Sequence, residues 1–202
     1  MNYKKISDLA ETIVHDTGPY EIIAEELGPA VCDYRKQWEQ AQSSFVKPAY
    51  PLHLNIEVVP GCNLRCEFCF YSGDKNEWSH QKSLRERLSF STYKKIIDEG
   101  VLNGLCSIAL NGNNEPLLQN DIAEYIRYAR KSGVLDISLH TNAMLLGREM
   151  SESLIDSGLT ILMFSIDAFT KETYESIRKG GNFETVVNNI EYFLELKRKR
   201  KK

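Results

Sequence analysis

Leu52–Val59 (LHLNIEVV) and the stretch that follows it, Pro60–Cys69 (PGCNLRCEFC), decide how this chain folds. Leu52, Leu54 and Ile56 alternate with polar residues, which is the period of a β-strand with one buried face. A Pro-Gly pair then breaks the strand, and three cysteines follow within eight residues. We therefore predict a strand that leads directly into a loop rich in cysteine.

The three cysteines of this loop, Cys62, Cys66 and Cys69, can supply three thiolate ligands from one short segment. Thiolates are soft ligands that select zinc, copper(I) or iron–sulfur centres. A centre with three protein ligands keeps one coordination position open, and an open position favours chemistry over scaffolding. We therefore expect a reactive metal centre at the end of the first strand.

Two other kinds of metal protein stay open at this point. Zinc sites usually contain paired CxxC motifs well separated in sequence, whereas this chain has one CxxC and a further cysteine upstream, so His53 or His80 would have to complete the site. A simple electron carrier would need a fourth cysteine ligand. Cys32 and Cys106 stand alone, and we expect both to be buried as small hydrophobic side chains.

The composition is that of a globular protein, with 202 residues, 42% of them hydrophobic and 26% charged. The net charge of −3 argues against a nucleic-acid partner. No run approaches the ~18 apolar residues of a membrane span, and the N-terminus does not resemble a signal peptide. Clustered cysteines outside a disulfide framework fit a reducing compartment. We therefore expect a cytoplasmic protein that binds neither nucleic acid nor membrane.

Four strand–helix units follow one another along the chain. The expected strands cover residues 52–59, 107–110, 135–139 and 160–166, and the expected helices cover 91–104, 121–133, 150–158 and 183–194, with a short helix at 172–177 before the last. We expect Ser91 and Asn182 to cap helices, and Asp121 with Glu124 to form a capping box. The strand at 160–166 is apolar throughout, as in strands buried on both faces.

Strict alternation of strands and helices predicts right-handed βαβ units on a parallel sheet. Four such units are half of an eight-stranded barrel, in which the chemistry lies at the C-terminal ends of the strands. We therefore predict an α/β fold: a partial, TIM-like (β/α) barrel at residues 51–202 with a helical extension at residues 1–50. The basic run Lys197–Lys202 suits a solvated last helical turn. Since half a barrel is an incomplete unit, we expect the sequence to be part of a longer protein.

The cysteine spacing Cys62-x3-Cys66-x2-Cys69, with Phe68 before the last cysteine, resembles the motif of the radical S-adenosylmethionine (SAM) enzymes. The resemblance implies that the cysteines bind three irons of a [4Fe–4S] cluster, that SAM chelates the fourth, and that Phe68 contacts the adenine region. It also implies that the reduced cluster cleaves SAM to a 5′-deoxyadenosyl radical, which abstracts hydrogen from a substrate. An external one-electron donor, such as flavodoxin or ferredoxin, would reduce the cluster.

The loop after the second strand, Gly112-Asn113-Asn114-Glu115, resembles the family's Gly-Gly-Glu-Pro loop, which binds the SAM amino group. Two asparagines replace the glycines, and asparagine tolerates left-handed backbone better than other residues with side chains. The resemblance implies that all four residues bind SAM. Glu57 and Asn55, on the polar face of the first strand, are expected to point into the barrel.

Two later segments continue the resemblance in the same order. Thr141-Asn142-Ala143 is similar to the family's Thr-Asn-Gly, and because alanine replaces glycine we expect no positive φ at residue 143. Ser165 and Asp167 belong to a Ser-Leu-Asp-like segment that reaches the SAM ribose or the substrate. Arg178 is expected either to approach the SAM carboxylate or to cap a helix, and we favour the structural role.

Within the family, Tyr34-Arg35-x2-Trp38 and Pro51–Leu54 resemble members that carry a later cysteine-rich domain, the SPASM or twitch type. Such members modify peptides, sugars or small metabolites. A glycyl-radical-enzyme activase is the alternative. We prefer the SPASM or twitch type because residues 165–190 resemble it, and we expect the auxiliary-cluster cysteines and the residues that choose the substrate beyond Lys202.

Overall fold

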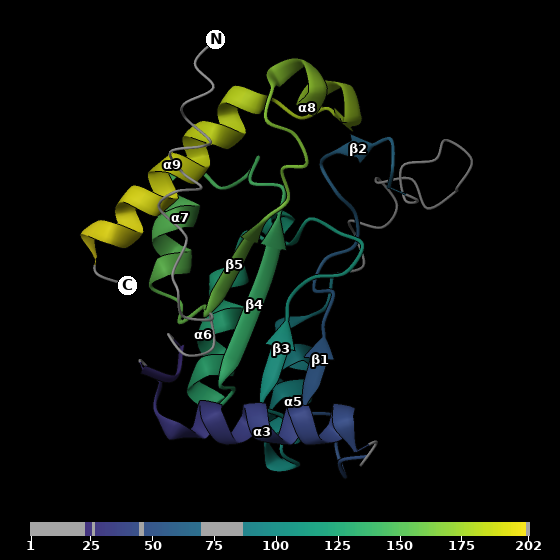
Figure 1. The fold of residues 1–202 in the computed structure, drawn as a ribbon, viewed down its shortest axis with the longest axis vertical. Coiled ribbons are helices and arrows are strands. Elements are labelled where there is room, and N and C mark those ends of the chain that lie inside the picture. The colour runs from purple at the N-terminus through teal and green to yellow at the C-terminus, as the bar shows by residue number, and fades with distance from the viewer. Residues whose placement is uncertain (1–22, 26, 45–46, 70–86, 201–202) are drawn as a thin grey trace.

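A computed structural model describes residues 23–25, 27–44, 47–69 and 87–200 of the chain. The first 22 residues of the expected helical extension, and His80, lie outside the described residues. In the described part, a four-stranded sheet has the order β1-β3-β4-β5, and every neighbouring pair is parallel (Figure 1). Its strands are β1 (His53–Asn55), β3 (Ser107–Ala109), β4 (Asp136–Thr141) and β5 (Ile161–Phe164). The predicted α/β fold with parallel βα units is confirmed.

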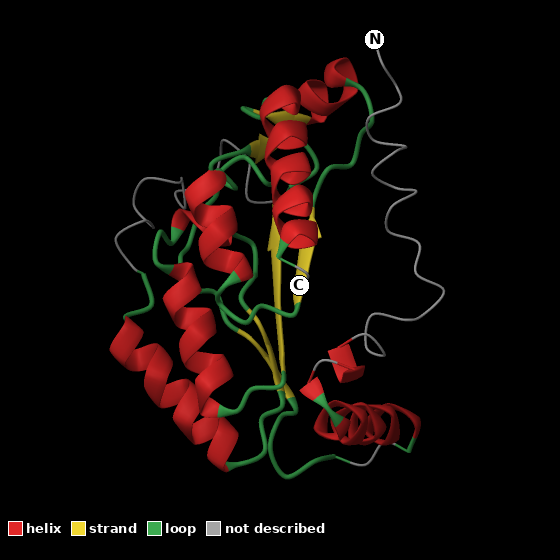
Figure 2. Ribbon diagram, turned by 90° about the vertical axis from the view of Figure 1, so that its left-hand side faces the viewer, coloured by secondary structure: helices red, strands yellow, loops and turns green. Residues whose placement is uncertain are grey.

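Helices cover one face of this sheet. They are α5 (Phe90–Leu102), α6 (Ile122–Ser132), α7 (Arg148–Ile155) and α9 (Phe183–Lys199). In Figure 2, α5, α6 and α7 lie to one side of the strands, and α9 lies in front of them. The core lies between helices and sheet, where Ile108, Ile137 and Leu139 are fully buried. Because side chains alternate along a strand, the residues between these apolar ones lie on the opposite, open face.

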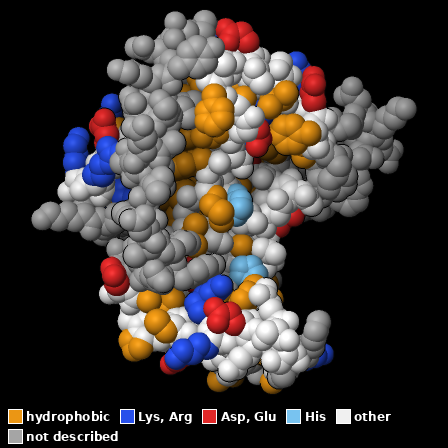
Figure 3. Space-filling model, viewed as in Figure 1, with side chains coloured by type: hydrophobic (Ala, Val, Ile, Leu, Met, Phe, Trp, Pro, Cys, Tyr) orange, Lys and Arg blue, Asp and Glu red, His pale blue; other side chains and the backbone are white. Residues whose placement is uncertain are grey.

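The open face of the sheet carries polar side chains. Figure 3 shows histidines on it, and these are His53 and His140, the two histidines among the described residues. Helix α3 (Pro29–Ser43) crosses the N-terminal end of the strands. Its Tyr34 hydroxyl donates a 2.9 Å hydrogen bond to Ser107 Oγ, and its Trp38 ring meets His53 edge-on at 5.9 Å. Helix α3 thus closes one end of the open face, which carries polar side chains on β1 and β4 and the apolar Ile161 and Met163 on β5.

Two strands differ from the sequence expectation. Regular pairing of the first strand is limited to β1, although the Ile56 amide still donates to the Ala109 carbonyl at 2.8 Å. The last strand, β5, is not buried on both faces as expected, because it lies at the edge of the described sheet and its Met163 is 37% exposed. The apolar run at residues 160–166 therefore predicted a strand correctly, but it did not predict that this strand lies at the edge of the described sheet.

The helix caps were predicted in part. Ser89, not Ser91, caps α5 by accepting from the Thr92 amide at 3.1 Å, because the chain turns into the helix two residues earlier than expected. Asp121 forms no side-chain cap on α6; its carboxylate instead accepts from the Gln119 side chain. The expectation that Cys32 and Cys106 are buried was wrong, because Cys32 is exposed and Cys106 is only partly buried.

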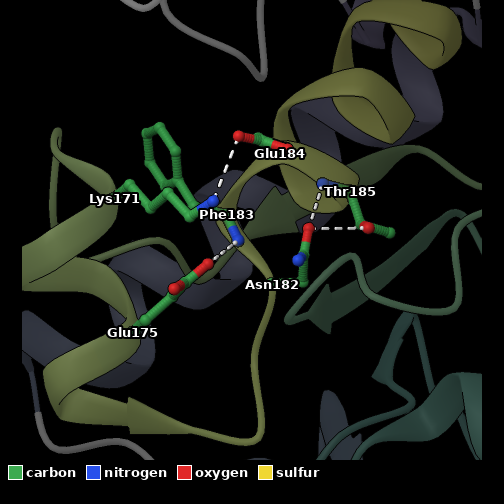
Figure 4. Close-up of polar contacts among 6 residues, drawn as sticks. All are labelled: Lys171, Glu175, Asn182, Phe183, Glu184 and Thr185. Atoms are coloured by element: carbon green, nitrogen blue, oxygen red, sulfur yellow. Dashed lines mark hydrogen bonds and ion pairs between the residues drawn. The ribbon is translucent and has the colours of Figure 1, made fainter.

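The start of α9 is fixed as predicted. Figure 4 shows Asn182 Oδ1 accepting from the Thr185 amide and hydroxyl, both at 2.8 Å. The preceding helix, α8 (Lys171–Ile177), is tied to the same turn, because Glu175 accepts from the Phe183 amide at 3.2 Å and Lys171 pairs with Glu184 at 3.1 Å. These contacts hold the segment between α8 and α9 in place.

That segment forms a small second sheet with the cysteine loop. Strand β2 (Arg65–Cys66) pairs antiparallel with β6 (Arg178–Lys179), with Cys66 opposite Arg178. The Glu67 amide extends the pairing to the Ile177 carbonyl at 2.9 Å.

Among the helices of the described residues, none combines the length and the apolar character that crossing a membrane requires.

Candidate active site

The cysteine loop lies at the edge of the sheet where the parallel strands end. In Figure 1 the β1, β3 and β4 arrows point toward the end of the molecule that carries β2. The loop folds back on itself, since the Cys69 amide donates to the Cys66 carbonyl at 3.0 Å. The pairing of β2 with β6 anchors its middle. The cysteines therefore sit where parallel α/β sheets carry their chemistry, as the sequence predicts.

Hydrogen-bond donors surround the sulfurs of this loop. The Leu64 amide and the Asn142 side-chain amide point at Cys62 Sγ, at 3.4 and 3.7 Å. The Arg178 guanidinium lies 3.8 Å from Cys66 Sγ. None of the three cysteines is in a disulfide. Donors that converge on sulfur stabilise a negative thiolate, so this set suits an anionic, sulfur-ligated centre such as an iron–sulfur cluster.

The thiols themselves resist ionisation in the absence of a metal. Burial, together with the nearby charges of Glu115 and Cys66, raises the pKa of Cys62 to about 11, although the hydrogen bonds from Leu64 and Asn142 oppose this shift. Burial also raises the pKa of Cys66, although Arg178 opposes this effect. Because a metal binds thiolates, assembly of a centre here must displace these protons.

A zinc site completed by histidine finds no geometric support at His53. Its Nδ1 lies 2.7 Å from Ser107 Oγ at the start of β1, which is the end of the sheet opposite the cysteine loop. Within the described ranges, no three His, Cys, Asp or Glu side chains are grouped as ligands of a single metal ion.

Glu115 joins the ends of two strands. Its carboxylate is buried and accepts three hydrogen bonds, from Thr141 Oγ1 at 2.7 Å and from the amides of Asn142 and Leu117 at 2.8 and 3.1 Å. Its own amide donates to the Gly61 carbonyl at 2.8 Å. Burial raises the pKa of Glu115, while the three hydrogen bonds lower it. Glu115 thus fixes the loops after β3 and β4 relative to the cysteine loop.

The rest of the 112–115 loop is held by the first strand and its extension. The Asn113 amide hydrogen-bonds Glu57, whose pKa is raised by burial and lowered by this bond. Asn114 donates to the Val59 carbonyl at 2.7 Å and accepts from the Gly112 amide at 2.9 Å. The Asn114 side chain therefore stabilises this loop, whereas Asn113 contributes through its backbone amide.

The segment after β4 places Asn142 against the cysteine loop. The Asn142 side chain donates to Asn63 Oδ1 at 2.8 Å and accepts from the Met144 amide at 3.0 Å. Ala143 has a φ of 61°, so the expectation of no positive φ was wrong. Its carbonyl accepts from Asn189 at 2.8 Å and its amide donates to Thr141 Oγ1 at 3.0 Å, and these bonds offset the strain that a side chain suffers there.

Ser165 and Asp167 follow β5 at the same end of the sheet. The Ser165 amide continues the pairing with β4 by donating to the Thr141 carbonyl at 2.9 Å. Asp167 has a φ of 57°, and its carboxylate forms an ion pair with Arg178. Phe68 is 62% exposed, and the Arg178 guanidinium lies 5.5 Å from its ring centre.

Two buried polar atoms beside the cysteine loop lack a partner among the described residues. They are Nε of Arg178, a residue that is 7% exposed, and the hydroxyl of Tyr174, which is fully buried. A buried donor without a partner is costly. Sequence reasoning missed the β2–β6 pair that brings Arg178 here, since two-residue strands leave no periodic signal.

Comparison with known proteins identifies the family. The sequence profile of the radical SAM superfamily matches residues 56–201. The chain belongs to the radical SAM superfamily. A probable GTP 3′,8-cyclase of Methanococcus maripaludis is 34% identical over 141 residues, which are 70% of this chain and 45% of the relative. The GTP 3′,8-cyclase of Alkaliphilus oremlandii is 32% identical over 139 residues, 68% of this chain and 42% of the relative. The chain thus spans less than half the length of these curated relatives.

Solved structures of radical SAM enzymes share the fold. The structure of native anSMEcpe with bound AdoMet has a TM-score of 0.58 and 26% identity, and the match covers 73% of this chain and 42% of that one. Streptococcus suis SuiB bound to S-adenosylmethionine has a TM-score of 0.60 at 19% identity, with 96% and 42% covered. Family, fold and the pair of cofactors, a [4Fe–4S] cluster and SAM, are confirmed. The SAM contacts of individual residues and the SPASM or twitch assignment stay predictions.

Proposed function

We propose that this chain is the cluster-binding and SAM-binding part of a radical SAM enzyme, with Cys62, Cys66 and Cys69 as the cluster ligands. The observation that carries the proposal is the convergence of Asn142 and Arg178, from two distant segments, on the sulfurs of the cysteine loop. When bound, the cluster supplies one electron to SAM, and the resulting 5′-deoxyadenosyl radical abstracts hydrogen from the substrate. The electron comes from an external one-electron donor such as flavodoxin or ferredoxin, in the cytoplasm.

The protein's own residues bind and orient the cofactors. Glu115 holds the 112–115 loop and Asn142 in register, so that backbone groups of Gly112, Asn113 and Asn114 can receive the SAM amine. The Arg178 guanidinium, which lies 3.8 Å from Cys66 Sγ, provides a positive charge for the SAM carboxylate. Phe68, Ser165 and Asp167 surround the same end of the sheet and supply the adenine and ribose contacts.

For the substrate we infer an uncharged polar molecule, such as a peptide, a sugar or a small metabolite. The open-face positions of the described strands, among them His53, Asn55, Ser138 and His140, include no lysine or arginine. Phosphate groups are usually bound by such cations. In support, anSMEcpe has been solved with a bound peptide, at 26% identity and a TM-score of 0.55.

A second candidate substrate is a nucleoside triphosphate. The names of the curated relatives, GTP 3′,8-cyclase, favour it. The matches cover 45% and 42% of those two relatives. A glycyl-radical-enzyme activase is a third candidate, which rests on the cysteine motif alone.

The decisive experiment is anaerobic reconstitution of the full protein with iron and sulfide. We expect bound iron and sulfide, visible charge-transfer absorbance, and release of 5′-deoxyadenosine from SAM on reduction. Cys66→Ala should abolish all of these, whereas Cys106→Ala should keep them, because the Cys106 thiol donates to the Gly104 carbonyl and lies outside the cysteine loop. Bound zinc without sulfide would refute the proposal. Stimulation of 5′-deoxyadenosine release by a cysteine-containing peptide, but not by GTP, would support the first substrate class, and the reverse result the second.

A further inference from the structure

Arg178 occupies an unusual position for a cation. It is 7% exposed and follows α8 directly, in the strand that pairs with the cysteine loop. One guanidinium nitrogen lies 3.8 Å from Cys66 Sγ, another pairs with Asp167, and the carbon between them lies 5.5 Å from the centre of the Phe68 ring. The guanidinium thus contacts a cluster ligand, a carboxylate and an aromatic face at the same time.

These contacts fix the direction in which the charge acts. The Arg178 side chain is 8% exposed, so water screens its charge weakly, whereas the Asp167 side chain is 46% exposed and its charge is screened more. The backbone of Asp167 is in the left-handed region, with a φ of 57°. The buried positive end of the pair therefore faces the sulfur, and the negative end faces solvent.

We propose that Arg178 sets the reduction potential of the cluster, as a positioning residue that acts through Cys66. The inference rests on the proposed function, because it requires a [4Fe–4S] cluster on the three cysteines. Reduction adds one electron from an external donor and takes the cluster from its 2+ to its 1+ state, with no bond formed or broken. A nearby positive charge and an N–H donor at a ligand sulfur both stabilise the more negative, reduced state. Arg178 thereby makes the cluster easier to reduce, and Asp167 limits this effect.

Potentiometric titration of the reconstituted full chain tests the inference. The cluster is reduced stepwise with dithionite and redox mediators, without SAM, and the reduced form is counted by electron paramagnetic resonance. At the potential where half of the wild-type cluster is reduced, we expect Arg178→Gln to lower the ratio of reduced to oxidised cluster about ten-fold, or ~59 mV for a one-electron couple. Arg178→Lys should restore most of the ratio, and Asp167→Asn should raise it.

Lys179 provides the matched control. It is the neighbouring cation in the same strand, but it is exposed and pairs with Glu67 at 3.5 Å. Lys179→Gln should leave the potential unchanged. Equal potentials in wild type, Arg178→Gln and Lys179→Gln would overturn the inference. If Arg178→Gln binds no cluster, an unchanged potential in Asp167→Asn would overturn it instead. A wild-type chain that binds no iron and sulfide would refute the proposed function first, which separates the two failures.

Discussion

The side-chain amide of Asn142 lies 3.7 Å from Cys62 Sγ, although the two residues are 80 positions apart in the sequence. The same amide donates to Asn63 Oδ1 at 2.8 Å. Asn142 therefore links the end of β4 to the cysteine loop through the residue next to the first cysteine. A link of this kind orients a metal ligand before the metal arrives, and such outer contacts tune both affinity and potential.

Asn142→Asp tests this link. The substitution keeps the size of the side chain but replaces a donor with a carboxylate oxygen that faces Cys62 and Asn63. We expect a loss of about 1–3 kcal/mol in the free energy of unfolding, because donors and acceptors no longer match, and a lower iron content after anaerobic reconstitution. Asn189→Asp is the control, since Asn189 donates to the carbonyls of Ala143 and Met144 but contacts no cysteine. Equal iron contents in the two variants would contradict the role of Asn142.

Much of this site could be predicted from the sequence because its residues come directly after periodic elements. The cysteine loop, Glu115 and Asn142 follow the first, second and third strands, and parallel strands bring their ends together. The family motif then gave the cofactors. Neither inference depended on contacts between distant side chains.

The features that were missed depend on such contacts. The positive φ of Ala143 is maintained by a hydrogen bond from Asn189, which lies 46 positions away on α9. The pairing of Cys66 with Arg178 joins two strands of two residues each, too short to show a period. The edge position of β5 depends on which strands pair, whereas its apolar run reports only burial.

Gly112 is required by its contact with Glu57. A Cβ at residue 112 would lie 2.8 Å from Glu57 Oε2 and 3.3 Å from Glu57 Cβ. We expect Gly112→Ala to displace Glu57 from the Asn113 amide and to cost about 1–3 kcal/mol, as overpacking usually does. Adding Glu57→Ala should recover part of this loss, which a double-mutant cycle of unfolding free energies measures. Gly147→Ala, at a position with nothing within 4 Å, is the control. Strict additivity of the two substitutions would rule out the contact.

Ser89 rather than Ser91 caps α5, and stability measurements can separate the two. Ser89 Oγ accepts from the Thr92 amide at 3.1 Å, whereas the Ser91 hydroxyl lies 3.0 Å from Ser89 Oγ and accepts no hydrogen bond from a backbone amide of the described residues. Ser89→Ala should cost about 1 kcal/mol in urea denaturation. Ser91→Ala should stay within about 0.5 kcal/mol of wild type. A larger loss at Ser91 would restore the original expectation from the sequence.

Glu115 should make stability depend on pH. Burial raises its pKa above the ordinary 4.5, so the folded state binds the proton more tightly than the unfolded state. Below 4.5 both states are protonated and the carboxyl has no ionisation cost. As pH rises through the raised pKa, folding must bury the charge, and the free energy of unfolding falls. In the Glu115→Gln variant the free energy of unfolding should not fall in this way, because glutamine carries no ionisable carboxyl. The variant should nevertheless be less stable by about 1–3 kcal/mol at acid pH, because its amide NH2 faces the Asn142 amide.

The difference between wild type and Glu115→Gln isolates this effect, since all other titrating groups are shared. We expect the stability advantage of the wild type to shrink as pH rises above the ordinary carboxyl pKa of 4.5, in urea denaturation of the metal-free chain. Glu99→Gln, which removes an exposed carboxylate from α5, is the control and should show no such trend. An advantage that grows with pH would mean that the hydrogen bonds from Thr141, Asn142 and Leu117 outweigh burial, and that Glu115 is held as an anion throughout.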